Sequence, residues 1–153
     1  MALHVRSRFL LLIVLFGLVG CLKTGRSSIP RSESHYEQSV QHALPLDTAV
    51  KRVEVALAKS YTDLPKVLRK KSLQEGTFLL QPKVSYRTGG PMGAVHHAPY
   101  TLAIAVHEKT IHLVFDLEKD PSSGEWAPSE AIPYIRHDFD AVVSNVEDAI
   151  AKH

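Results

Sequence analysis

Cysteine is almost absent from this chain, because Cys21 is the only one among 153 residues. A single thiol excludes a disulfide within the chain and a cluster of thiolates around a metal ion in the monomer. The hydrophobic content of 44% and the charged content of 22% are ordinary for a folded protein, so extensive disorder is not expected. The length predicts one folded domain.

The sequence also lacks a strong excess of charge. The net charge is +2 at pH 7, and the only charged residues before Cys21 are Arg6 and Arg8. These two belong to the 18 basic residues, and the other 16 balance the 16 acidic residues. The one dense basic run, residues 69–71, is expected at a solvated helix end. Nucleic acids need a concentrated basic surface, so no nucleic-acid partner is predicted.

No hydrophobic run in the sequence is long enough to span a membrane. The longest covers residues 9–19, whereas a spanning helix needs about 20 apolar residues. The run follows a start that carries Arg6 and Arg8 and no acidic residue. A basic start followed by a short apolar run is typical of a secretory signal peptide. We therefore predict that residues 1–20 are a signal peptide.

The apolar run closes on Leu18-Val19-Gly20-Cys21, and these four residues resemble the lipobox of bacterial lipoproteins. The resemblance covers the first 21 residues only. It implies cleavage before Cys21, a lipid on the Cys21 sulfur and a protein held on a bilayer by its acyl chains. Residue 22 is Leu rather than Asp, which resembles lipoproteins that are sent to the outer membrane and face the periplasm.

The segment after Cys21 differs in composition from the rest of the chain. Residues 21–46 are rich in Ser, Arg, Lys, His and Gln, contain Pro30 and Pro45, and show little apolar periodicity. This composition predicts a lipidated flexible tether. Residues 47–153 are then expected to form a single α+β domain.

Helical periodicity marks both ends of that domain. Val50, Val53 and Leu57 recur at spacings of three and four, which predicts a helix over residues 47–61. A second, short helix is expected over residues 64–71. A last helix is expected to start near Asp138. Its apolar stripe consists of Phe139, Val142, Val143, Val146 and Ile150.

Alternating apolar residues predict strands in the middle of the chain. One strand is expected over residues 78–86, bent or at a sheet edge because Pro82 lacks an amide donor. A hairpin is expected over residues 100–117, with Val106 opposite Ile111 across the turn. This register also opposes apolar residues in the pairs Ile104–Leu113, Leu102–Phe115 and Tyr100–Leu117. A slip by one residue would expose the whole set.

Each of these elements has a single apolar face, and this limits the possible folds. The economical arrangement is an α+β two-layer sandwich, in which an antiparallel meander of three to four strands is packed by an N-terminal and a C-terminal helix. No domain family is recognised in the part of the sequence after Leu22.

Histidine is the only functional residue type that is enriched, with nine in the chain. The hairpin register places His107 and His112 on the same sheet face, diagonally across neighbouring strands. His96 and His97 precede the first strand of the hairpin. Imidazole suits zinc and copper, and a site needs three or four converging donors. A histidine-dependent zinc or copper site at these four residues is therefore the alternative function.

Motifs for catalysis and phosphate binding are lacking. No serine lies in a Gly-x-Ser-x-Gly elbow, and the glycine-rich residues 88–98 lack the Gly-Lys-Ser/Thr ending of a phosphate loop. That segment, with Met92 and Val95, suits a mobile contact with a partner. Trp126 is either a partner anchor or a residue that closes the core. The sequence thus predicts a membrane-anchored, non-enzymatic envelope module without a cofactor, which binds an envelope protein or an amphiphile.

Overall fold

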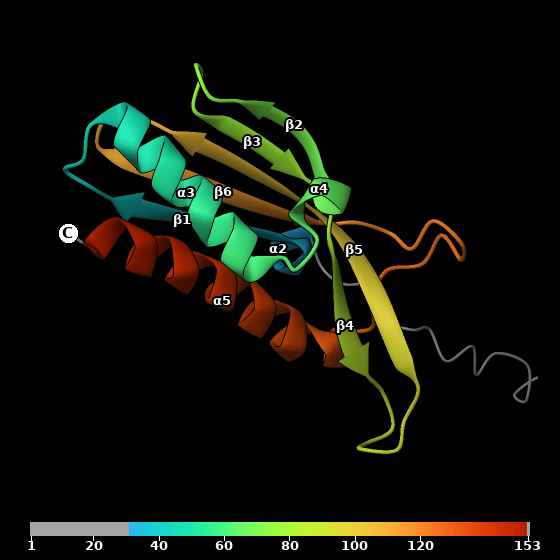
Figure 1. Cartoon of the computed structure of the whole chain (residues 1–153). Helices are drawn as coiled ribbons and strands as arrows, with labels where there is room; N and C mark the ends of the chain where they lie inside the picture. The colour runs from blue at the N-terminus through green and yellow to red at the C-terminus, as the bar shows by residue number, and fades with distance from the viewer. Residues whose placement is uncertain (1–30, 153) are drawn as a thin grey trace, which may run out of the picture.

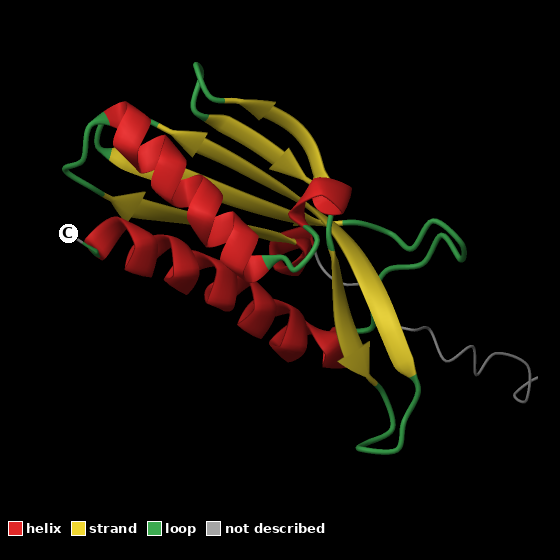
Figure 2. Ribbon diagram, in the orientation of Figure 1, coloured by secondary structure: helices red, strands yellow, loops and turns green. Residues whose placement is uncertain are grey.

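The fold combines one antiparallel sheet with two long helices that lie across one of its faces (Figure 1, Figure 2). It comes from a computed structural model, which describes residues 31–152. The strands are β1 (His35–Gln41), β2 (Leu68–Ser72), β3 (Thr77–Leu80), β4 (Lys83–Arg87), β5 (Val95–Val106) and β6 (Thr110–Leu117). The helices are α2 (Arg31–Ser34), α3 (Leu46–Ser60), α4 (Leu64–Val67), the short 3-10 helix η1 (Ser129–Ala131) and α5 (Ile132–Ala151).

The predicted α+β class is confirmed, and the sheet is larger than expected. It has six strands in place of three or four, in the order β1-β6-β5-β3-β2, with β4 paired separately to β5. Residues 1–20, predicted as a signal peptide, and Cys21 lie outside the described residues. Within residues 31–152, no helix combines the length and the apolar character needed to cross a bilayer.

The hairpin at the centre of the sheet has the predicted register. Val106 lies opposite Ile111, and the pairing continues to Tyr100 opposite Leu117. The residues that face the helices are at most 4% exposed on both strands from residue 100 onward. The register is thus determined by the apolar alternation, because only this pairing buries one complete face.

The expectation of a flexible tether over residues 21–46 is wrong for its described part. Residues 35–41 form β1, which pairs along its whole length with β6. The side chain of Tyr36 stacks near Phe115 and Phe139, and Val40 is 6% exposed. This strand has few apolar residues of its own. Its pairing depends on β6, which offers a free edge and the aromatic neighbours.

Two further predicted elements are divided in the structure. The helix expected over residues 64–71 stops at Val67, and residues from Leu68 onward form β2 on the edge of the sheet. The strand expected over residues 78–86 is divided at Pro82 into β3 and β4, which pair with different parts of β5. In both places the apolar pattern is present, and the partner strand decides where each element begins and ends.

The core lies between the sheet and the two long helices. The predicted stripe of α3 is buried, including Val53 and Leu57. In α5, Phe139 stacks on Phe115 of β6 with ring centroids 4.4 Å apart. This helix starts at Ile132, earlier than the expected start near Asp138, because a proline is well tolerated in the first turn of a helix, where Pro133 lies.

The first part of β5 leaves the main sheet. Residues 95–99 of β5 pair with β4 alone, and the two strands project past the ends of the other strands (Figure 1). We call β4, residues 88–94 and residues 95–99 of β5 the arm. The arm therefore includes most of the glycine-rich segment and both His96 and His97. The remainder of β5 belongs to the central sheet.

Gly76 lies in the turn that joins β2 to β3, and its substitution tests how closely this turn packs. Its φ is +63°, and an added Cβ would lie 2.8 Å from the carbonyl oxygen of Val106. Gly124 has a similar φ of +69° with open space around it. We expect Gly124→Ala to lower the free energy of unfolding by about 1 kcal/mol through backbone strain. Gly76→Ala should lower it by about 3 kcal/mol, because the added methyl group also collides with the backbone. Urea denaturation measures both free energies of unfolding. Equal losses of stability in the two variants would contradict the close approach of Gly76 to the Val106 carbonyl oxygen.

Candidate functional site

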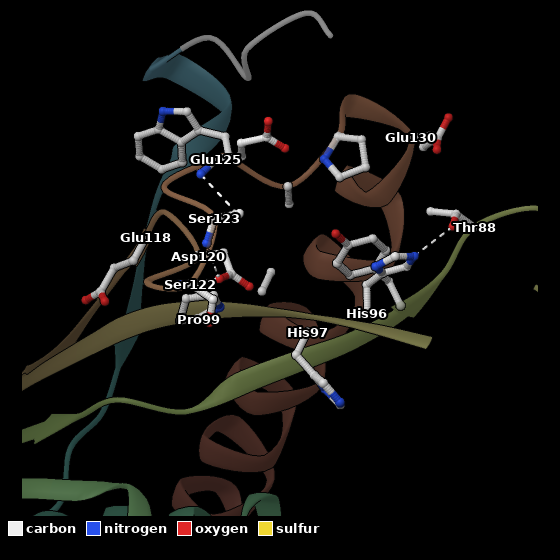
Figure 3. Close-up of a pocket in the computed structure, with 15 residues that line it drawn as sticks. Thr88, His96, His97, Pro99, Glu118, Asp120, Ser122, Ser123, Glu125 and Glu130 are labelled. Carbon is white, nitrogen blue, oxygen red and sulfur yellow. Dashed lines mark hydrogen bonds between the residues drawn. The ribbon is translucent and has the colours of Figure 1, made fainter. Parts of the chain in front are cut away.

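A cleft of about 390 Å³ lies between the arm and the segment that connects β6 to α5 (Figure 3). One wall comes from the arm and carries Tyr86, Thr88 and His96. The other wall comes from residues 118–130, which include Trp126. The cleft is therefore built by segments that are distant in sequence and are brought together by the departure of β5 from the sheet.

The loop wall is organised by Asp120. Its carboxylate accepts hydrogen bonds from the backbone amides of Ser122 at 2.7 Å and Ser123 at 3.2 Å. The backbone of Asp120 also bonds to Gly124 and Glu125. The two side-chain bonds stabilise the ionised carboxylate and lower the pKa of Asp120 below its usual value. This is the turn that the Asp-Pro-Ser-Ser-Gly sequence is typical of.

The cleft wall is acidic and aromatic. Four carboxylates line it, from Glu118, Asp120, Glu125 and Glu130, and no lysine or arginine does. Glu118 accepts a hydrogen bond from the hydroxyl of Thr101. At the rim, the ammonium group of Lys119 lies 5.9 Å from the ring centre of Trp126. The cleft thus offers negative charge beside an aromatic surface, which suits a positively charged group.

Two histidines, His96 and His97, belong to the arm wall, and their side chains point to opposite sides of the strand. The ring of His96 stacks on Tyr86 with centroids 5.5 Å apart, and its Nε2 lies 3.0 Å from the Thr88 hydroxyl. Figure 3 shows His96 directed toward Thr88 and His97 directed to the other side of the strand. His97 Nδ1 lies 3.0 Å from the hydroxyl of Ser85 there. Adjacent residues on a strand face opposite sides, so only His96 is directed into the cleft.

The base of the arm is fixed by a chain of partly buried hydrogen bonds. Tyr100 of β5 donates to the carboxylate of Asp138 in α5 at 3.2 Å. Because its only phenolic proton is used in that bond, Tyr100 accepts from the hydroxyl of Tyr61, 2.9 Å away, at the end of α3. Burial raises the pKa of both tyrosines, and burial also raises the pKa of Asp138. Both long helices therefore hold the point at which the arm begins.

The four histidines of the proposed metal site lie in two separate places. His107 and His112 do approach each other, with ring centroids 5.5 Å apart, as the hairpin register predicted. His96 and His97 lie near the other end of β5, about 30 Å away along the strand at its usual rise per residue. They cannot share a metal ion with His107 and His112. Residues 31–152 contain no group of three or more His, Cys, Asp or Glu side chains placed to hold one.

Hydroxyl and imidazole groups meet at several positions on the strands. Besides the Thr88–His96 and Ser85–His97 pairs, the hydroxyl of Ser39 lies 2.9 Å from Nδ1 of His112. In a Ser-His-Asp triad, a carboxylate hydrogen bonds to the imidazole and orients it. Within residues 31–152, none of these imidazoles has a carboxylate hydrogen bonded to it. These pairs are cross-strand or neighbouring-strand contacts that support the sheet.

The sequence identified parts of this site without assembling them. Residues 88–98 and Trp126 were singled out as candidates for partner contact, and both border the cleft. The carboxylates were missed, because nothing in the local sequence around Glu118 and Asp120 indicates that they face the arm. These carboxylates face the arm only because the arm projects from the sheet. The sequence features related to this projection are Pro82, which divides the strand before the arm, and the length of the apolar alternation.

Comparisons with known proteins show a shared fold. The sequence matches no protein-family profile and no curated protein sequence. The structure is similar to that of a TBP-like protein from Parabacteroides distasonis, with 12% identity and a TM-score of 0.57, over 76% of this chain and 91% of that one. It is also similar to a DUF4468 family protein from Bacteroides ovatus, with 6% identity and a TM-score of 0.54, over 84% and 92% of the two chains. At these identities the likeness concerns the fold alone.

The contribution of Asp138 to the hydrogen-bonded base of the arm can be tested through the pH dependence of folding stability. Because its folded-state pKa is raised, the folded state binds the proton more tightly than the unfolded state. This contribution to stability is complete below the ordinary aspartate pKa and is lost as the pH rises through the raised value. We expect Asp138→Asn to remove that loss, so the variant should lose less stability than the parent between pH 3.5 and pH 7.

Urea denaturation at the two pH values measures the difference. Asp148→Asn is the matched control, because Asp148 lies on the same helix with its side chain 60% exposed. An Asp138→Asn variant with the same pH dependence as the parent and the control would show that Asp138 does not contribute to stability through this hydrogen-bonded group.

Proposed function

We propose that this protein is a lipid-anchored lipoprotein of the bacterial envelope that acts as a non-enzymatic binding module. The anchor is Cys21, and the expected location is the outer membrane on its periplasmic side. Support for the anchor comes from the sequence, in which a basic start, a short apolar run and Leu18-Val19-Gly20-Cys21 occur in the order typical of lipoproteins. Two or more acyl chains are sufficient for stable attachment to a bilayer.

The observation that carries the binding role is the acidic cleft beside the arm. It has the volume of a small ligand site, about 390 Å³, and an aromatic side chain at its wall. Among the described residues, its lining includes four carboxylates and no lysine or arginine. The bound component is therefore an envelope protein or an amphiphile that presents a positively charged group to the cleft. Attraction between opposite charges favours such a partner over an anionic one.

The cleft can act as a recognition surface without a chemical step. Its two walls are held in place by the loop around Asp120 and by the hydrogen bonds of Tyr100 at the base of the arm. A preorganised surface loses little conformational entropy when a partner binds. Binding by this module would recruit the partner to the membrane through the lipid on Cys21.

The anchor is tested by the mass of the protein isolated from membranes of the producing bacterium. We expect a chain that begins at Cys21 and carries the added mass of a diacylglyceryl group, with or without a further acyl chain. The Cys21→Ser control should remain uncleaved and without lipid. A native product with a free thiol at Cys21, or one that still begins at Met1, would refute the envelope assignment.

The binding role is tested by photo-crosslinking in cells. A crosslinking amino acid at Ser122, which is exposed at the cleft, should capture a partner, whereas the same amino acid at exposed Lys51 of α3 should not. Neutralising two carboxylates with Glu118→Gln and Glu130→Gln should lower the yield by about fivefold, since exposed ion pairs contribute up to about 1 kcal/mol. Glu147→Gln, exposed on α5, is the matched control.

Two results would contradict this role for the cleft. One is the same crosslinked product from Lys51 and Ser122. The other is a yield that does not change when the two cleft carboxylates are neutralised.

A further inference from the structure

Exposed apolar side chains gather at the tip of the arm. Residues 31–152 have five large hydrophobic side chains that are strongly exposed. Two of them lie in the arm, Met92 at 98% and Val95 at 49% exposure, and a third, Tyr134 at 55%, lies beside it at the start of α5. Val95 and Tyr134 line one hollow of about 540 Å³ together with Pro91, and Met92 follows Pro91 in the chain. Isolated apolar residues on a surface are ordinary, but a group of them indicates a contact.

The tip carries little charge. Residues 88–98 contain no Asp, Glu, Lys or Arg. Arg87 is the one charged residue among those that line the hollow, and its guanidinium donates to the backbone oxygen of Pro91 at 3.2 Å. The hollow shares only Tyr86 with the acidic cleft. Within the described part of the chain, no carboxylate lines the hollow. Contact between the tip and a bilayer would therefore not remove water from a lining carboxylate or bring one close to a lipid phosphate.

The tip has the side-chain chemistry of a membrane-interface contact. Met92 and Val95 supply apolar surface, and Tyr134 has an apolar ring with a polar hydroxyl at its end. Tyrosine is enriched at the level of the lipid headgroups for this reason. Met92 and Val95 lie at the end of the arm, which projects beyond the other strands of the sheet (Figure 1), and Tyr134 lies at the start of α5.

The place where the described chain begins lies at the same end of the sheet as the arm. Helix α2 precedes β1, whose first residue, His35, lies opposite Asp116 near the end of β6. On the other side of β6, Asp116 pairs with Thr101, next to the base of the arm. Nine residues lie between Cys21 and Arg31, and the ten residue-to-residue steps of a fully extended chain span at most about 35 Å. A lipid on Cys21 therefore keeps this end of the domain close to the bilayer.

We propose that the tip of the arm, with Met92 and Val95, inserts into the interface of the bilayer to which the protein is anchored, and that Tyr134 of α5, which lines the same hollow as Val95, joins this contact. The inference rests on the proposed lipid anchor and adds a second, non-covalent membrane contact. With two points of attachment, the domain has a defined orientation. The cleft, which borders the arm, then opens near the membrane surface, where an envelope partner would be met.

Tryptophan fluorescence tests the insertion. Met92→Trp places a reporter at the tip, and Glu108→Trp places one at the exposed turn between β5 and β6, at the opposite end of the sheet. The full chain, as processed by the producing cell, is reconstituted into vesicles of phosphatidylethanolamine and phosphatidylglycerol with brominated acyl chains. The signal of Trp126, the single native tryptophan, is subtracted using the parent protein. Bromine quenches tryptophan only at short range, so quenching reports contact with the acyl region.

We expect quenching at position 92 to exceed that at position 108 by about threefold or more, because only the tip is expected to reach the acyl region. Val95→Glu in the Met92→Trp background should reduce this quenching toward the Glu108→Trp value, since a buried charge disfavours insertion. Equal quenching at the two positions overturns the proposal. So does shielding of Trp at position 92 from aqueous acrylamide without bromine quenching, which would indicate contact with a second copy.

The lipid on Cys21 is measured on the same sample by mass spectrometry, which separates the two proposals. A lipidated chain without quenching at position 92 overturns the membrane contact and leaves the anchor intact. Quenching at position 92 in a chain without lipid supports the contact and overturns the anchor. A chain with neither property overturns both.

Discussion

The stacking of Phe139 on Phe115 joins α5 to the middle of the sheet, and the rest of the structure depends on this aromatic contact. Tyr100 completes the group, with its ring centroid 4.8 Å from that of Phe139. All three side chains are at most 1% exposed. A group of this size dominates the energy of a small core, because each aromatic side chain buries a large apolar area. It also determines which face of the sheet the helices cover.

Tyr100 connects this core to the candidate site. Its ring belongs to the aromatic group, while its hydroxyl donates to Asp138 and accepts from Tyr61. The same residue follows the part of β5 that forms the arm. The arm therefore projects from a point held by the sheet and by both long helices. This explains how a hairpin outside the main sheet can form a defined wall of the acidic cleft and present an apolar tip.

Much of the fold could be predicted from single elements of the sequence. The alternation over residues 100–117 was sufficient for the exact pairing of Val106 with Ile111, and the periodicity of Val50, Val53 and Leu57 was sufficient for α3. The candidate site could be predicted only in part. Residues 88–98 and Trp126 were recognised, but the carboxylates opposite them were not, because their meeting depends on the angle at which the arm leaves the sheet.

By itself, the sequence determined the α+β class, the register of the central hairpin and the faces that α3 and α5 bury, since these follow from the spacing of apolar residues along one segment. Only the tertiary structure decided that residues 35–41 form a strand, that residues 68–72 pair at an edge and that His96 and His107 lie far apart. The physical reason is that a strand with few apolar residues is stabilised by its neighbour. The identity of that neighbour is a property of the assembled sheet and is not encoded in the local pattern.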